Sequence, residues 1–101
     1  MLASNAYFSL KAHSLGPAAA DDLEAILNYL LEHRPSLAQS TVRKLYGAAR
    51  SLKQFSNRGR IGQLEGTREL VMTPLPYIIV YGVEPKIVHI FRVIHTSENW
   101  P

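Results

Sequence analysis

The sequence predicts an α+β domain in which a small antiparallel sheet packs against an α-helical hairpin, in the order β-α-α-β-β-β. Apolar residues recur every three or four positions between residues 17 and 55, which is typical of amphipathic helices. Tyrosine, valine and isoleucine dominate residues 68–95, and short turns separate their runs, which indicates consecutive strands. A sheet and a helical hairpin can bury their apolar faces against each other.

The first half of the chain is expected to form one strand and two helices. Residues 7–13 alternate loosely between apolar and polar and predict the first strand. Pro17 suits the first turn of a helix, Pro35 ends that helix, and Ser36 can cap the next one. Acids near the start of the first helix complement its dipole. The apolar positions of the first helix are Ala20, Leu23, Ile26, Leu27, Leu30 and Leu31, and those of the second are Ala38, Val42, Leu45, Ala49, Leu52 and Phe55.

The second half is expected to form a glycine-containing loop and an antiparallel meander. The loop covers residues 57–66, and the strands cover residues 68–73, 77–83 and 87–95, with prolines in both turns. Because each apolar set lines one face of its element, we expect one shared core. It should contain Leu23, Ile26, Leu30, Leu45, Leu52, Ile79 and Val93.

Composition sets limits on the function. The 101 residues predict a single domain, 1–101, and the formal net charge of +3 indicates an acidic partner. The absence of cysteine excludes disulfides and thiolate metal sites, and favours a cytoplasmic location. No apolar run is long enough to span a bilayer, so no membrane association is expected. No cofactor motif is found, and the histidines are too scattered to predict a metal site: His13, His33, His89 and His95.

The charges of the two predicted helices differ. From Asp21 to Glu32 every charged residue is an acid, whereas the second helix and the loop after it carry six cations and no acid between residues 43 and 60. This basic run is either a solvated face or a contact surface for an acidic segment. For the second interpretation the candidate contacts are Arg43, Arg50 and Lys53.

Four short segments stand out in this order: Ala20–Ile26; Ser51–Phe55 with Gly59 and Arg60; Gly66–Leu70 with Pro76–Tyr81; and Arg92–His95 with Trp100 and Pro101. Taken together, they resemble the RelE/ParE family of toxins from type II toxin–antitoxin systems of the plasmid-stabilisation type. The resemblance implies the same fold and a small, acidic cognate antitoxin encoded beside the toxin. The link from the first strand to the first helix departs from the family pattern.

The resemblance implies one of two activities. RelE-like members are ribosome-dependent endoribonucleases that cut messenger RNA, whereas ParE-like members bind and poison DNA gyrase without catalysis. Glu69, Val71 and Ile78 stand where the nuclease branch has basic residues, and one acid and two apolar side chains cannot hold a phosphate. The chain is therefore closer to the ParE side. The residues expected to bind the target are Arg60, Arg68, His95 and Trp100.

The alternative is a ribonuclease site made of a histidine and arginines, with Arg60, Arg68, Arg92 and His95 as candidates. Strict strand alternation places Arg92 with Ile90 and Ile94, on the face opposite to His95. Arg92 and His95 could share a site only if the strand is bulged or turns there. The plainer interpretation of His95 is a polar residue at a strand end, held by the backbone.

Overall fold

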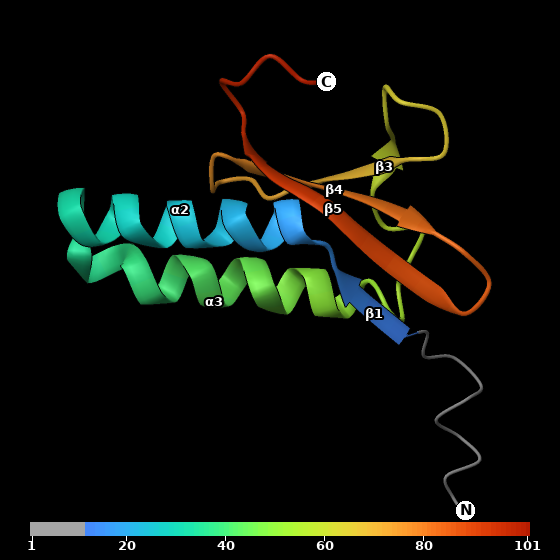
Figure 1. Ribbon diagram of the computed structural model, residues 1–101, viewed down its shortest axis with the longest axis horizontal. Helices are drawn as coiled ribbons and strands as arrows, with labels where there is room; N and C mark the ends of the chain where they lie inside the picture. Colours follow the sequence, from blue (N-terminus) through green and yellow to red (C-terminus); the bar gives the residue numbers. More distant parts are fainter. Residues whose placement is uncertain (1–11) are drawn as a thin grey trace, which may run out of the picture.

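Two helices and a five-stranded sheet make up the computed structural model, which describes residues 12–101 (Figure 1). The strand order across the sheet is β1-β5-β4-β3-β2. The α+β class and the antiparallel meander of the last three strands are confirmed. The elements are β1 (Ala12–Leu15), α2 (Pro17–His33), α3 (Pro35–Ser51), β2 (Arg60–Ile61), β3 (Arg68–Val71), β4 (Tyr77–Val83) and β5 (Ile87–His95).

Proline begins both helices. Pro17 and Pro35 stand at the first helical positions, where a residue without an N–H leaves no donor unsatisfied. The predicted cap at Ser36 is wrong, because α3 already starts at Pro35 and its N-cap is Arg34, with no side-chain hydrogen bond. No acid lies in the first turn of α2 either. Asp22, one turn further on, has another role, described below.

The edge strand β1 differs from the expected first strand. It covers Ala12–Leu15 and so includes the last two of the predicted residues 7–13, whereas residues 7–11 lie outside the described part. It runs parallel to β5, pairing Ala12 with Ile87 and Leu15 with Ile90. The sheet is therefore mixed. The connection after β1 contains both helices, so no tight turn forces the antiparallel direction.

Two further details of the sheet were not expected. The predicted loop at residues 57–66 contains β2, whose Arg60 pairs with Glu69 of β3. In β5, Ile90 pairs with Tyr81 while Arg92 pairs with Val80, so Phe91 is the extra residue of a β-bulge. The bulge reverses the alternation, and both Ile90 and Val93 therefore face the core.

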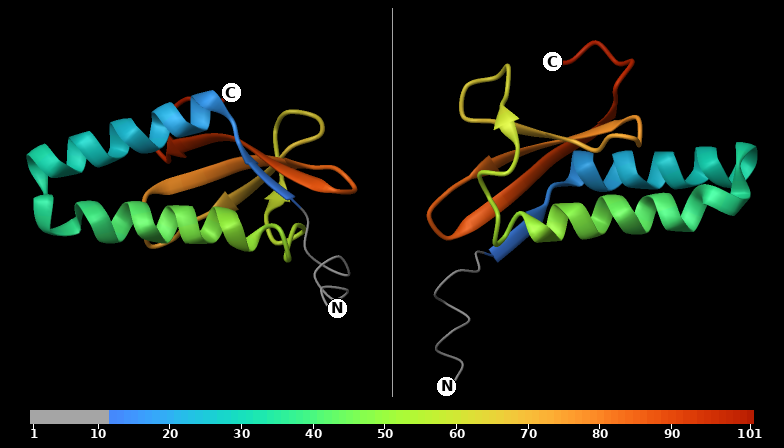
Figure 2. Two further views of the ribbon diagram at one scale, coloured as in Figure 1. Left: turned by 60° about the horizontal axis from the view of Figure 1, so that its bottom comes forward. Right: turned by 180° about the vertical axis from the view of Figure 1, so that it is seen from behind.

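The core lies between the hairpin and one face of the sheet, as the two views of Figure 2 show. Most of the predicted core is confirmed: five of the seven named residues belong to the buried cluster, and Ile26 packs against it partly buried. Leu30 is buried but lies outside this cluster. The hairpin extends past the sheet at its tip, around Arg34 (Figure 1). None of the helices within residues 12–101 is long and apolar enough to cross a membrane. The buried cluster consists of Ala19, Leu23, Leu45, Ala49, Leu52, Leu70, Tyr77, Ile79, Tyr81, Val88, Ile90 and Val93.

Candidate functional site

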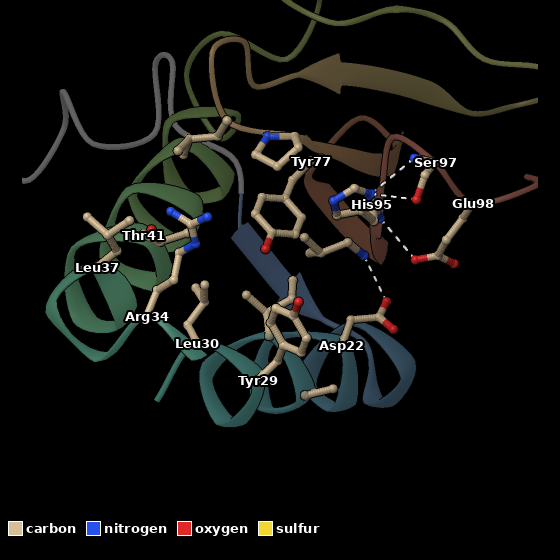
Figure 3. A pocket seen from close by; sticks show the side chains of 15 residues that line it. Asp22, Tyr29, Leu30, Arg34, Leu37, Thr41, Tyr77, His95, Ser97 and Glu98 are labelled. Carbon is tan, nitrogen blue, oxygen red and sulfur yellow. Dashed lines mark hydrogen bonds between the residues drawn. The ribbon is translucent and has the colours of Figure 1, made fainter. Parts of the chain in front are cut away.

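A cavity of about 740 Å³ opens between the hairpin and the C-terminal end of β5 (Figure 3). Its walls are mostly apolar and come from α2, α3 and the turn before β4. Figure 3 shows His95 on one side of the Tyr77 ring and Arg34 on the other. This volume lies in the range of ligand pockets in proteins. His95 is the one candidate site residue from the sequence that lines this cavity.

The residues after β5 hold the His95 ring in place. The Ser97 backbone N–H donates to Nδ1 at 3.1 Å, and the Ser97 hydroxyl lies 2.7 Å from the same nitrogen. The His95 N–H donates to Glu98 Oε1 at 2.9 Å. Because Nδ1 accepts a hydrogen bond, the proton of the neutral ring is assigned to Nε2. His95 is thus a strand-end residue held by local backbone contacts.

Tyr77 stands against His95 in the cavity wall. The two rings meet edge to face with centroids 5.5 Å apart. Burial raises the pKa of the Tyr77 hydroxyl, and a charge on Tyr29 across the cavity would raise it further. The phenol therefore stays protonated near neutral pH. Arg34, at the tip of the hairpin, brings a positive charge to the opposite wall and forms no ion pair within residues 12–101.

Arg92 is fixed by Asp22 of α2. Its Nε donates to Asp22 Oδ2 at 2.7 Å and its Nη2 donates to Oδ1 at 3.0 Å, and this hydrogen bonding raises the pKa of Arg92. The same carboxylate accepts the Val93 N–H at 2.8 Å, at the edge of β5 that β1 no longer covers. The guanidinium also lies 5.6 Å from the centre of the Trp100 ring, a cation–π contact. Arg92 therefore joins α2, β5 and the C-terminal segment.

Arg60 and Arg68 both have partners inside the molecule. Arg60 Nη2 lies 2.9 Å from Oε1 of Glu69, whose side chain is 4% exposed, while that of Arg60 is 60% exposed. Arg68 Nη1 donates to the Gly59 carbonyl at 2.6 Å. Arg60 is thus a surface cation beside a buried acid, and Arg68 holds a loop.

Tyr81 anchors the same loop from the core. Its hydroxyl accepts the Gly59 N–H at 2.8 Å and donates to the Ser56 carbonyl at 2.8 Å. The side chain is fully buried. Burial raises the pKa of this hydroxyl, so it remains a neutral group that can donate and accept at once. Tyr81 and Arg68 together fix residues 56–59 against the sheet.

The candidate residues do not form one cluster. Strand pairing joins Arg60 to Glu69, Glu69 to Val80 and Val80 to Arg92, which places both arginines on the sheet face away from the hairpin. His95 pairs with Tyr77 and faces the hairpin. The bulge does not bring Arg92 and His95 together, because it precedes both of them.

Arg68 is distant from His95 along the sheet. Arg68 pairs with Tyr81 and His95 pairs with Tyr77, four residues away on β4. At about 3.3 Å per residue, this separates the two positions by roughly 13 Å along the strand. Of the remaining candidates, only Trp100 and Arg92 are in contact.

The basic run of α3 borders a groove of about 440 Å³ on the outside of the hairpin. Arg43 and Arg50 lie at this groove, whose floor contains Leu27, Val42 and Tyr46. Lys53 lies just beyond the end of α3. Burial lowers the pKa of His13, and the positive charges of Lys53 and Arg50 lower it further. Arg43, Arg50 and Lys53 form no ion pair with any residue of the described part.

Comparison with known proteins identifies the family. Residues 14–100 match the family model of the ParE toxin of type II toxin–antitoxin systems. The chain belongs to the RelE/ParE family of toxins. Toxin RelE2 of Caulobacter vibrioides is 40% identical over 79 residues, which cover 78% of this chain and 88% of that protein. Toxin RelE3 of the same organism is 33% identical over 92 residues, covering 89% of this chain and 99% of that one.

A solved structure of the chromosomal ParDE system of P. aeruginosa agrees with this assignment. It superposes on the RelE/ParE toxin chain described here with a TM-score of 0.79 at 25% identity, covering 85% of this chain and 96% of that chain. Asp22, the partner of Arg92 70 residues away, was not expected from the sequence of this toxin. Its position near the start of a helix suggested only a dipole effect, and no local pattern indicates so distant a partner.

Proposed function

We propose that this toxin acts by binding DNA gyrase in the manner of ParE, without catalysing a reaction itself. The main support is that the four candidate nuclease residues do not converge. Arg60, Arg68 and Arg92 have internal partners, and His95 faces the other side of the sheet from Arg60 and Arg92. A ribonuclease needs cations and a proton-transfer group around one phosphate. A toxin that acts by binding needs only a shaped surface.

The proposed target surface includes parts of both sheet faces and extends from β2 at one edge of the sheet to the C-terminal segment after β5. Arg60 offers an exposed cation, and Trp100 adds an aromatic side chain that is held over Arg92. His95 lies where the chain leaves the sheet. Arg68, which we also assign to this surface, contributes mainly by placing the loop that carries Arg60.

Expression of the toxin without its antitoxin tests this proposal. We expect filamentous cells and a DNA-damage response while translation continues at first. Purified gyrase should lose supercoiling activity or accumulate cleaved DNA. His95→Ala should weaken this effect without abolishing it, because a binding surface loses only one contact. His33→Ala, at an exposed histidine on the hairpin, is the matched control.

A ribosome-dependent ribonuclease is the alternative, favoured by one observation. The proton-bearing Nε2 of His95 has no hydrogen bond within residues 12–101, and the neutral Tyr77 hydroxyl shares its cavity. This nitrogen is free to hydrogen-bond a substrate, and the protonated form of the ring could donate a proton from it. Prompt collapse of translation, with messenger RNA cut only on ribosomes and no cutting by His95→Ala, would establish this alternative and reject gyrase.

We also infer that a small, acidic antitoxin neutralises this toxin by binding the outside of the hairpin. Arg43, Arg50 and Lys53 lie there without acidic partners in the described part of the chain, and two of them border an apolar groove. Such a surface fits an acidic amphipathic segment.

A further inference from the structure

At one of the glycine positions, the fold itself does not require a glycine. Four of the six glycines approach neighbouring atoms so closely that a Cβ would meet them, and Gly66 has a positive φ of 81°. Gly47 differs from all of these. A Cβ at Gly47 would have nothing within 4 Å, and its φ is not positive.

Gly47 also costs the molecule stability. It lies inside α3, which runs from Pro35 to Ser51, and it is exposed. Glycine is destabilising in a helix interior compared with alanine, because its backbone loses more freedom on folding. Neither the φ angle nor the packing requires glycine at this position. The one advantage that glycine offers here is the open space above the helix where a side chain would otherwise stand.

That space lies between two grooves. Gly47 borders the outer groove of about 440 Å³, beside Val42 and Tyr46. It also borders a second groove of about 450 Å³ on the other side of α3, beside Met72 and Leu75. A segment that crosses α3 at Gly47 would reach apolar surface on both sides.

Cations surround this crossing point. Arg43 and Arg50 belong to the outer groove and Lys44 to the second one, and all three are exposed. On a helix these residues lie three or four positions from Gly47 and share its face. The chain has no acid between Glu32 and Glu65, so α3 supplies no negative charge of its own. The complementary ligand is therefore acidic as well as amphipathic.

We propose that Gly47 is the close-approach point for an acidic amphipathic helix of the antitoxin, which crosses α3 there and places its carboxylates on Arg43, Lys44 and Arg50. This rests on the proposed neutralisation by an antitoxin and names its contact point. A helix packs at 8–10 Å from its neighbour depending on the side chains at the contact, and glycine permits the closest approach.

Substitution of Gly47 separates this role from a structural one. Gly47→Ala should raise the melting temperature of the free toxin by roughly 4 to 8 °C, because alanine suits a helix interior better. The same variant should bind the antitoxin more weakly, and Gly47→Leu should weaken binding roughly tenfold or more by steric overlap. Ala20→Leu, at an exposed position of α2 outside both grooves, should leave binding unchanged.

The binding partner in this experiment is the product of the neighbouring gene that restores growth when it is co-expressed, titrated calorimetrically against each variant. If it fails to bind the wild-type toxin, both the antitoxin proposal and this inference are rejected. If it binds wild type and Gly47→Leu equally, only this inference is rejected. Two other results would also overturn it: a dimer of the toxin that Gly47→Leu abolishes, or duplex DNA binding that requires Arg43, Lys44 and Arg50 while antitoxin binding does not.

Discussion

The Tyr81 hydroxyl links the core to the loop that carries Arg60. It is fully buried and has a backbone donor at Gly59 and a backbone acceptor at Ser56. Buried polar groups of this kind are costly when they lose their partners. The position of the loop therefore depends on this hydroxyl together with the Arg68 guanidinium.

Tyr81→Phe should lower the free energy of unfolding by about 1–3 kcal/mol, because the Gly59 N–H and the Ser56 carbonyl would lose this partner. Chemical denaturation measures the change. Tyr46→Phe, at a side chain that is 44% exposed, should change stability by less than about 0.5 kcal/mol. A loss no larger than that of the control would show that the hydroxyl does not anchor the loop.

His13 should make stability depend on pH. Burial lowers its pKa first, and Lys53 and Arg50 lower it further. The His13 side chain therefore binds a proton more readily in the unfolded chain than in the folded chain. The free energy of unfolding should be unaffected by this group above the unfolded pKa of about 6.5, and it should decrease as the pH falls below that value. In melting curves recorded from pH 8 to pH 5, His13→Phe should flatten this decrease and His33→Gln should not.

At the scale of elements, the sequence predicted those helix starts and turns that depend on the chemistry of neighbouring residues. Both helices begin at prolines because the ring suits the first helical position, and the meander follows from Pro74, Pro76 and Pro85 in its turns. Local chemistry did not decide the parallel direction of β1 or the bulge at Phe91. The pair of Asp22 and Arg92 depends on the packing of α2 against β5, which spacing along the chain does not encode.

Asp22 should stabilise the junction of α2, β5 and the C-terminal segment. Asp22→Ala should cost about 2–3 kcal/mol, because it removes charge-assisted hydrogen bonds to Arg92 and Val93. The chain has a single tryptophan, so its fluorescence reports on Trp100, and the emission should shift to the red as Arg92 loosens. Asp21→Ala, at the exposed neighbouring position, is the control. Equal effects of the two substitutions would contradict this role.

At the scale of the whole molecule, charge is distributed unevenly. The acids of α2 and the cations of α3 lie on neighbouring helices, and all three cations of α3 are exposed. A surface of one sign speeds the encounter with a partner of the other sign, and salt screens this effect.

Reversing Arg43, Arg50 and Lys53 to glutamate should slow association with the antitoxin, and the difference from wild type should shrink as salt rises. Stopped-flow mixing at several salt concentrations measures this. Lys86→Glu, in the turn between β4 and β5, should have a much smaller effect per charge. If the association rate responds neither to the three charge reversals nor to salt, the hypothesis of electrostatic steering is rejected.

The position of β5 between β1 and β4 has a consequence for the timing of biosynthesis. When the ribosome has synthesised the chain as far as β4, both helices have been made. The core that they share with the sheet still lacks Val88, Ile90 and Val93 of β5. The first strand likewise has no neighbour until β5 appears. Contacts between residues so far apart form late. The shared core therefore cannot be completed before β5 has been synthesised. We expect that interval to be available to an antitoxin already present in the cell.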